Sequence, residues 1–227
     1  MNFLSLTNRL KTEAGVIGSP LASLVSPVAE VQRLSNWIQA AWIDIQEAHD
    51  DWFFLRNAIT FSTVAQQQTY SEAQAGLAIG RLGNWKRDSF RIYNPSIGVS
   101  NEMIMPFIDY DTFRDQFQYG SMRTTYTRPT VLSIDPQRNM VLGAIPDAVY
   151  TVNGEYYAAP SDLLVDADVP VLPTRYHMLI VYRAMVHYGL YESASEVIQR
   201  GQAEFDKMMA RLMADQLPDV VFGPPLC

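Results

Sequence analysis

The sequence predicts an α+β protein: mainly an α-helical bundle from the N- and C-terminal helices, with an inserted β-rich lobe and an extended C-terminal arm. Apolar residues recur at helical spacing near both ends, and the middle carries alternating runs bounded by turn residues. The last ten residues contain three prolines. Helical stripes at the two ends need each other for burial, so residues 1–56 and 173–217 form the expected bundle. Residues 57–172 are the expected β-rich insertion, and residues 218–227 the arm.

Two helices are expected before the β-rich part. A short amphipathic helix comes first and ends near Gly15, a residue typical of helix C-termini. Residues 16–25 are expected to form a loop. Ser26 then supplies an N-cap and Pro27 suits the first helical position, so a long helix is expected from Pro27 to Trp52. Its apolar stripe comprises Val31, Leu34, Ile38, Ala41, Trp42, Ile45, Ala48 and Trp52.

The first half of the middle segment reads as strands separated by loops. Residues 59–64 alternate with a period of two, and residues 90–93 end at an Asn-Pro turn signal. The polar, glycine-containing segment 66–83 between them is expected to be a turn or loop. A further strand over residues 103–108 is interrupted by Pro106.

A short helix, a hairpin and one more strand complete the insertion. Asp109 is a candidate cap for a helix whose Tyr110, Phe113 and Phe117 share a face. Residues 130–134 and 140–145 flank a turn and predict a hairpin. The pair Asn153-Gly154 is a possible hairpin turn, but alternation continues past it, so one strand over 149–157 is favoured.

Two helices are expected after Pro173. Residues 176–191 are apolar nearly all round, which predicts a helix buried by several neighbours. Ser193 with Glu196 matches a capping box that opens the next helix, and Pro218 ends it. One face of that helix carries Val197, Gly201, Phe205, Met208, Leu212 and Gln216.

Composition limits the classes of partner. The formal net charge is −7, with 17 Lys and Arg against 24 Asp and Glu. Proteins that grip duplex DNA use basic residues to displace counterions from phosphates, so we expect no specific DNA binding. The one cysteine, Cys227, cannot form an internal disulfide, and a cytosolic origin is expected. The most apolar window, 176–191, contains Arg183 and is too short for a membrane span.

No enzyme signature is present, and no catalytic, cofactor-binding or metal-binding residue is predicted. His49 lies beside two aspartates near the expected end of the long helix, where a hydrated last turn is the ordinary interpretation. His177 and His187 fall on different faces of one helix, so both are interpreted as core or interface histidines. A metal loop over Asp162, Asp166 and Asp168 would need a glycine for its turn, so a solvated loop is favoured.

Several segments together resemble the head–tail adaptor proteins of tailed phages. They are Leu34–Gln46, Asp51–Arg56, Val149–Tyr157, Pro160–Leu163, Tyr176–Tyr191 and Ala203–Met209. The resemblance implies a virion protein at the head–tail junction, which is made in the bacterial host cytoplasm and forms a ring, commonly of twelve copies. It also implies binding to the portal protein and to a downstream tail or nozzle protein, with DNA passing through the ring.

The arm is the candidate partner interface. Its apolar and proline residues are Leu217, Val220, Val221, Phe222, Pro224, Pro225 and Leu226. Proline stiffens a segment and lowers the ordering entropy lost on docking, so the arm suits a contact with the portal or another partner. Alternatives are an arm that folds back or stays disordered, a head-completion or tail terminator protein, and a soluble module that binds a ligand or partner.

Overall fold

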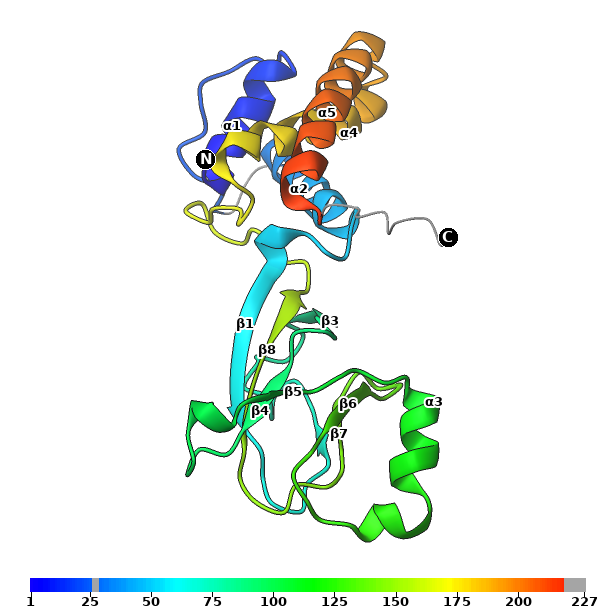
Figure 1. Cartoon of the computed structure of the whole chain (residues 1–227). Helices are drawn as coiled ribbons and strands as arrows, with labels where there is room; N and C mark the ends of the chain where they lie inside the picture. Colours follow the sequence, from blue (N-terminus) through cyan, green and yellow to red (C-terminus); the bar gives the residue numbers. More distant parts are fainter. Residues whose placement is uncertain (26–28, 219–227) are drawn as a thin grey trace, which may run out of the picture. The chain divides into compact units, whose positions relative to one another are not determined.

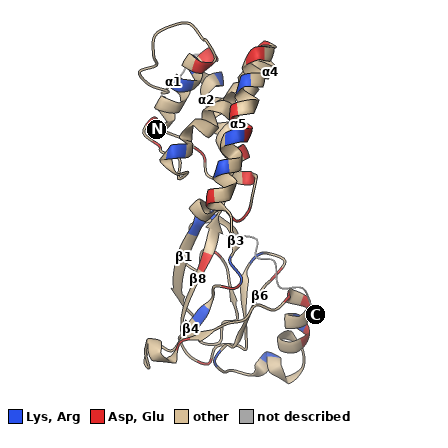
Figure 2. Cartoon of the chain, turned by 45° about the horizontal axis from the view of Figure 1, so that its top comes forward, with Lys and Arg blue, Asp and Glu red and all other residues tan. Residues whose placement is uncertain are grey.

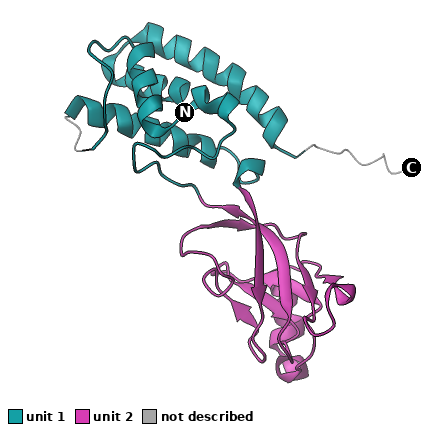
Figure 3. Cartoon of the chain, turned by 90° about the vertical axis from the view of Figure 1, so that its left-hand side faces the viewer, with its two compact units in different colours: residues 1–55, 160–227 teal, residues 56–159 magenta. Residues whose placement is uncertain are grey.

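The computed structural model of the protein describes residues 1–25 and 29–218. It confirms the α+β prediction, because helices from both ends of the chain pack together and antiparallel sheets are inserted between them (Figure 1). The chain forms two compact units (Figure 3). One comprises Met1–Leu55 and the chain from Pro160 onward, and the other is Arg56–Ala159.

Helix α4 is the centre of the helical unit. The helices of this unit are α1 (Phe3–Glu13), α2 (Ala29–Glu47), α4 (His177–Glu192) and α5 (Ser195–Gln216), with short 3-10 turns η1 (Phe53–Leu55) and η5 (Thr174–Tyr176). α4 packs against α1, α2 and α5, which confirms the helix expected to be buried by several neighbours. Leu179, Ile180 and Val181 are fully buried although they are consecutive, so α4 buries more than one face.

Two glycines allow α4 and α5 to pack closely. A Cβ atom on Gly201 would lie 3.0 Å from the Tyr182 carbonyl oxygen, and one on Gly189 would lie 2.6 Å from Ile198 Cγ1. The predicted capping box between these helices is wrong. Ser193 adopts a left-handed conformation and ends α4, and α5 begins after Ala194 with no side-chain cap. Ser193, the residue expected to cap α5, is instead part of the tight turn between the two helices.

Trp52 corrects the predicted end of the long helix. α2 ends at Glu47, yet Trp52 is fully buried in the same core as the helical stripe. Its indole Nε1 donates a hydrogen bond to the Ile45 carbonyl oxygen at 3.0 Å, satisfying a carbonyl in the last turn of α2. The chain therefore turns back onto the end of α2. Trp52 keeps the spacing of the apolar stripe although it is no longer part of the helix. Ser26 and Pro27 lie outside the described residues.

The inserted unit contains two antiparallel sheets. The strands of the five-stranded sheet are β1 (Arg56–Ser62), β8 (Thr151–Ala158), β4 (Arg91–Tyr93) and β5 (Met103–Ile104) in that order, with β3 (Leu82–Trp85) also paired to β8. The three-stranded sheet has the order β2 (Thr69–Tyr70), β7 (Met140–Gly143) and β6 (Val131–Ile134). The hairpin β6–β7 is as predicted, whereas the expected loop 66–83 contains β2 and the start of β3.

Short helical segments follow β4 and β5. They are η2 (Val99–Asn101), α3 (Tyr110–Phe113), the π-helical turn η3 (Arg114–Gln118) and the 3-10 turn η4 (Gly120–Thr124). Asp109 caps α3 as predicted, because its carboxylate accepts a hydrogen bond from the Thr112 backbone N–H at 2.8 Å. Phe113 stacks on Phe117 with ring centroids 5.3 Å apart, so the predicted shared face exists.

Gly154 explains why Asn153-Gly154 is not a turn. Strand β8 runs without interruption from Thr151 to Ala158, as favoured from the sequence, and pairs Gly154 with Ile59 of β1. A Cβ atom on Gly154 would lie 2.3 Å from Cδ1 of Phe90, which is fully buried. The glycine therefore makes room for an aromatic ring that packs against the strand.

Replacing Gly154 by alanine should destabilise the inserted unit by about 1–3 kcal/mol, because the added methyl group overlaps the Phe90 ring. Denaturant titration followed by near-UV circular dichroism measures the free energy of unfolding. In the double variant Gly154→Ala with Phe90→Leu, the total cost should be smaller than the sum of the single costs. Strict additivity of the two substitutions would show that the ring does not set the requirement for glycine.

Candidate partner-binding surfaces

Of the predicted arm residues, only Leu217 lies in the described part of the chain. It directly follows α5, is half-buried against the helical core, and donates its N–H to the Met213 carbonyl oxygen at 3.1 Å. The rest of the predicted interface lies outside the described residues: Val220, Val221, Phe222, Pro224, Pro225 and Leu226. The C-terminal end of α5 is held against η5, since the Asp215 carboxylate pairs with Arg175 and the Tyr176 hydroxyl donates to the Arg211 carbonyl at 3.3 Å.

A cluster of aromatic side chains on α2 and α4 was not predicted as a site. Trp37 lies 5.6 Å from Tyr188 and 5.5 Å from Tyr191 between ring centroids, and the Arg33 guanidinium lies 4.9 Å from the Tyr191 ring. Tyr191 is 54% exposed. Tryptophan, tyrosine and arginine are the residues that concentrate binding energy in protein interfaces. The sequence held one signal for it, because Trp37 falls outside the apolar stripe of its helix.

The loop between Leu163 and Leu172 presents a second apolar surface on the helical unit. Asp166 accepts hydrogen bonds from the Ser23 hydroxyl at 2.6 Å and the Leu24 N–H at 2.9 Å. Asp168 accepts from the N–H groups of residues 164 and 165. The loop was predicted to be solvated; in the structure, the carboxylates of Asp166 and Asp168 also fix its backbone by these hydrogen bonds. The fixed backbone leaves four apolar side chains more than half exposed: Leu164, Val165, Val169 and Val171.

His177 and His187 lie in and beside the helical core, in agreement with their interpretation as core or interface histidines. His177 is buried, with Nε2 2.9 Å from the Leu172 carbonyl oxygen and Nδ1 2.6 Å from the Met1 amine. Burial lowers the pKa of His177 below its ordinary value. His187 lies 3.1 Å from the Asp44 carboxylate. His49 lies past the end of α2, edge-on to the Trp52 ring at 4.9 Å.

The rest of the described chain shows no sign of a site for nucleic acid or for a metal ion. Helix α5 carries acidic and basic side chains along its length (Figure 2), so it lacks the basic run that binds phosphates. Within residues 1–25 and 29–218 there is no group of three metal-ligating side chains. None of the helices in those ranges has the length and apolarity needed to cross a bilayer.

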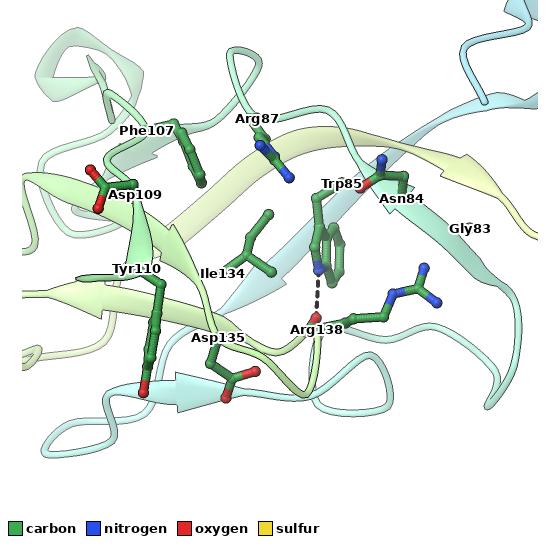
Figure 4. Close-up of a pocket in the computed structure, with 10 residues that line it drawn as sticks. All are labelled: Gly83, Asn84, Trp85, Arg87, Phe107, Asp109, Tyr110, Ile134, Asp135 and Arg138. Atoms are coloured by element: carbon green, nitrogen blue, oxygen red, sulfur yellow. Dashed lines mark hydrogen bonds between the residues drawn. The ribbon is translucent and has the colours of Figure 1, made fainter. Parts of the chain in front are cut away.

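A cavity of about 530 Å³ lies in the inserted unit (Figure 4). It is lined by Gly83, Asn84, Trp85, Arg87, Phe107, Asp109, Tyr110, Ile134, Asp135 and Arg138. Its polar groups mostly serve the fold. The Arg138 carbonyl accepts from the Trp85 indole at 2.9 Å, the Arg87 guanidinium stacks on Phe107, and Asp135 holds the N–H groups of its own turn. The cavity therefore offers few uncommitted groups for recognising a small molecule.

The buried His177 predicts a pH dependence of stability. Its folded-state pKa is below that of the unfolded chain, so on acidification the unfolded state takes up the proton first. Stability should be intact above about pH 6.5 and should fall as the pH drops from there toward the folded-state pKa. Denaturant titration at about pH 7.5 and about pH 5.5 measures the loss. His177→Gln keeps a donor toward the Leu172 carbonyl and should lose less stability; an equal loss would contradict this origin.

The family model for SU10 adaptor protein matches residues 1–224, nearly the whole chain. No curated protein sequence matches it. The protein therefore belongs to the SU10 adaptor protein family, a family of phage head–tail adaptors. Membership assigns it a structural role as a phage adaptor that binds other virion proteins, and identifies no enzymatic activity.

Proposed function

We propose that this member of the SU10 adaptor protein family forms a ring of twelve copies below the portal of a tailed phage. The ring extends the conduit through which DNA leaves the head, and docks the downstream tail or nozzle protein. The observation that carries the proposal is the family match over residues 1–224, which includes both the helical unit and the inserted unit.

The surfaces of the helical unit support assembly with other proteins. The aromatic cluster around Trp37 and the loop that displays Leu164 and Val169 are both held by internal contacts. A preorganised apolar or aromatic surface loses little entropy when it is covered by a partner. The net charge of −7 agrees with a conduit that DNA passes without specific binding.

The arm from Leu217 to Leu226 is the proposed contact with the portal. Helix α5 delivers it from a fixed base at Asp215. Burying its apolar side chains at about 25 cal/mol per Å² would contribute a few kcal/mol for each copy. Because each copy in a ring contributes one arm, modest individual contacts would hold the ring strongly through avidity.

A small-molecule-binding module is less favoured, because the polar groups that line the cavity of the inserted unit mostly bond within the fold. A head-completion or tail terminator protein would share the ring but contact a different neighbour. The portal is therefore the partner to test first.

Co-sedimentation with the purified portal protein of the same phage tests the proposal. Full-length protein should bind as a ring, and a chain ending at Leu217 should bind at least about tenfold more weakly, equivalent to 1.4 kcal/mol. Phe222→Asp should weaken binding in the same way, because it places a charge in an apolar contact, whereas Asp219→Asn serves as the matched control and should bind normally.

Equal binding of the full-length and shortened chains would keep the adaptor function and refute the role of the arm. If neither chain binds, the portal is the wrong partner, and the same assay with the downstream tail protein tests the head-completion and terminator alternatives.

A further inference from the structure

Four exposed apolar side chains gather around one turn of the helical unit. The Asp168 N–H closes the turn by donating to the Val165 carbonyl at 2.9 Å, which brings residue 165 close to residue 169. After the turn, burial alternates along the chain: Val169 and Val171 are 59% and 57% exposed, and the residue after each of them is buried. Together with Leu164 and Val165, which are 76% and 58% exposed, they form what we call the loop surface.

Backbone contacts hold the loop surface in place. The Phe3 N–H donates to the Asp168 carbonyl at 2.8 Å, and the Leu4 N–H donates to the Asp166 carbonyl at 3.2 Å, so the turn lies against the start of α1. A fixed surface loses little entropy when it is covered, and exposed apolar patches mark contact sites. The loop surface is therefore ready for an occupant.

The backbone of this segment also has donors to offer. No group among the described residues accepts a hydrogen bond from the N–H of Val169 or of Val171. An extended chain that lies alongside can therefore add backbone hydrogen bonds to the apolar contact, as an extended peptide does at the edge of a sheet. A helix cannot do so, because its carbonyl groups are bonded internally. The loop surface thus favours an extended, apolar occupant.

The C-terminal arm begins within reach of the loop surface. Asp215, near the end of α5, forms an ion pair with Arg175. Val171 comes four residues before Arg175, so it lies within about 14 Å of that residue along the chain. Beyond Leu217, the ten residues 218–227 can span about 33 Å when extended. The arm is therefore long enough to cover the loop surface of its own chain.

The arm and the loop surface match in chemistry. From Val220 to its end the arm has no charged side chain, and its apolar residues include Phe222 and Leu226. The loop surface has no charged side chain of its own, and the carboxylates of Asp166 and Asp168 beside it accept hydrogen bonds from backbone N–H groups. Two uncharged apolar surfaces gain free energy in water when each covers the other.

Tethering favours the arm over any separate molecule as the occupant. A segment joined to its site by a short chain has an effective concentration in the millimolar range, so a second copy at micromolar concentration competes poorly with it. An arm held on its own chain also hides apolar surface that would otherwise link copies together.

We propose that the arm folds back and covers the loop surface of its own chain until the protein meets the portal. This proposal rests on the proposed function, because the residues that cover the loop surface are the ones proposed to contact the portal. The arm then has two alternative positions, and the portal competes with the loop surface for it. Transfer of the arm to the portal leaves the loop surface free for a neighbour in the ring.

Cross-linking within the isolated protein tests the folded-back arm without the portal. The natural Cys227 ends the arm, and Ala167→Cys places a second thiol in the turn without removing any apolar side chain of the loop surface. Ala203→Cys is the matched control. It is exposed on α5 about 21 Å from Leu217, so a free arm would reach it as well.

A short thiol-to-thiol reagent added to dilute protein should link Cys227 to Ala167→Cys at least about tenfold faster than to Ala203→Cys, because only the first thiol lies beside the docked arm. Mass spectrometry of the digested protein measures both links. Equal rates for the two variants would show an arm without a preferred position and overturn the proposal. Links that form only between chains would show that the arm covers a neighbour, and would overturn it too.

A charge in the loop surface tests the competition with the portal. Val171→Asp should release the arm, because docking would then bury a carboxylate, and the exposed position should leave the helical unit folded. The link from Ala167→Cys to Cys227 should form about tenfold more slowly in this background, and portal binding should tighten at least about threefold because the competing site is lost. Ile79→Asp, at an exposed position of the inserted unit, is the control and should change neither.

The two readouts separate this proposal from the proposed function. Unchanged cross-linking in the Val171→Asp variant would overturn the loop surface as the docking site. Slower cross-linking with unchanged portal binding would overturn the competition. Cross-linking as expected in a protein that does not sediment with the portal would support the folded-back arm and contradict only the proposed function.

Discussion

Helix α4 has apolar side chains on nearly all of its faces, and such a helix is stable in water only when neighbours surround it. The surrounding elements are α1, α2 and α5, which come from the two ends of the chain. The ends must therefore meet, and the segment between them becomes an insertion. The chain enters that insertion through β1 and leaves through β8, which pair along their whole length from Arg56 opposite Tyr157 to Ser62 opposite Thr151. The fold class thus depends on how one helix is covered.

This dependence explains why much of the fold could be predicted from the sequence. Periodicity reports which faces are buried, so it identified α4, α5 and the strands β1, β4, β5 and β8, but it missed β2 and β3. Local turn chemistry identified the Asp109 cap and the β6–β7 hairpin. Prediction from the sequence failed where contacts between distant segments decide the local structure. Trp52 returns to the helix core through a turn, and Ser193 is used to end a helix instead of capping the next one. Neither is visible in the spacing of residues.

The candidate surfaces were harder to predict for a related reason. An arm rich in proline is conspicuous in a sequence, but most of it lies outside the described residues. The cluster of Trp37, Tyr188 and Tyr191 is a property of the packing between α2 and α4, which no single segment encodes.

The proposed function places copies of this chain in a ring at the head–tail junction. The most direct measurement is a cryo-electron microscopy reconstruction of that junction in the phage particle. We expect twelve copies of this chain directly below the portal, surrounding a channel wide enough for duplex DNA. Density for the chain elsewhere in the particle, or a junction that lacks it, would contradict the proposed function.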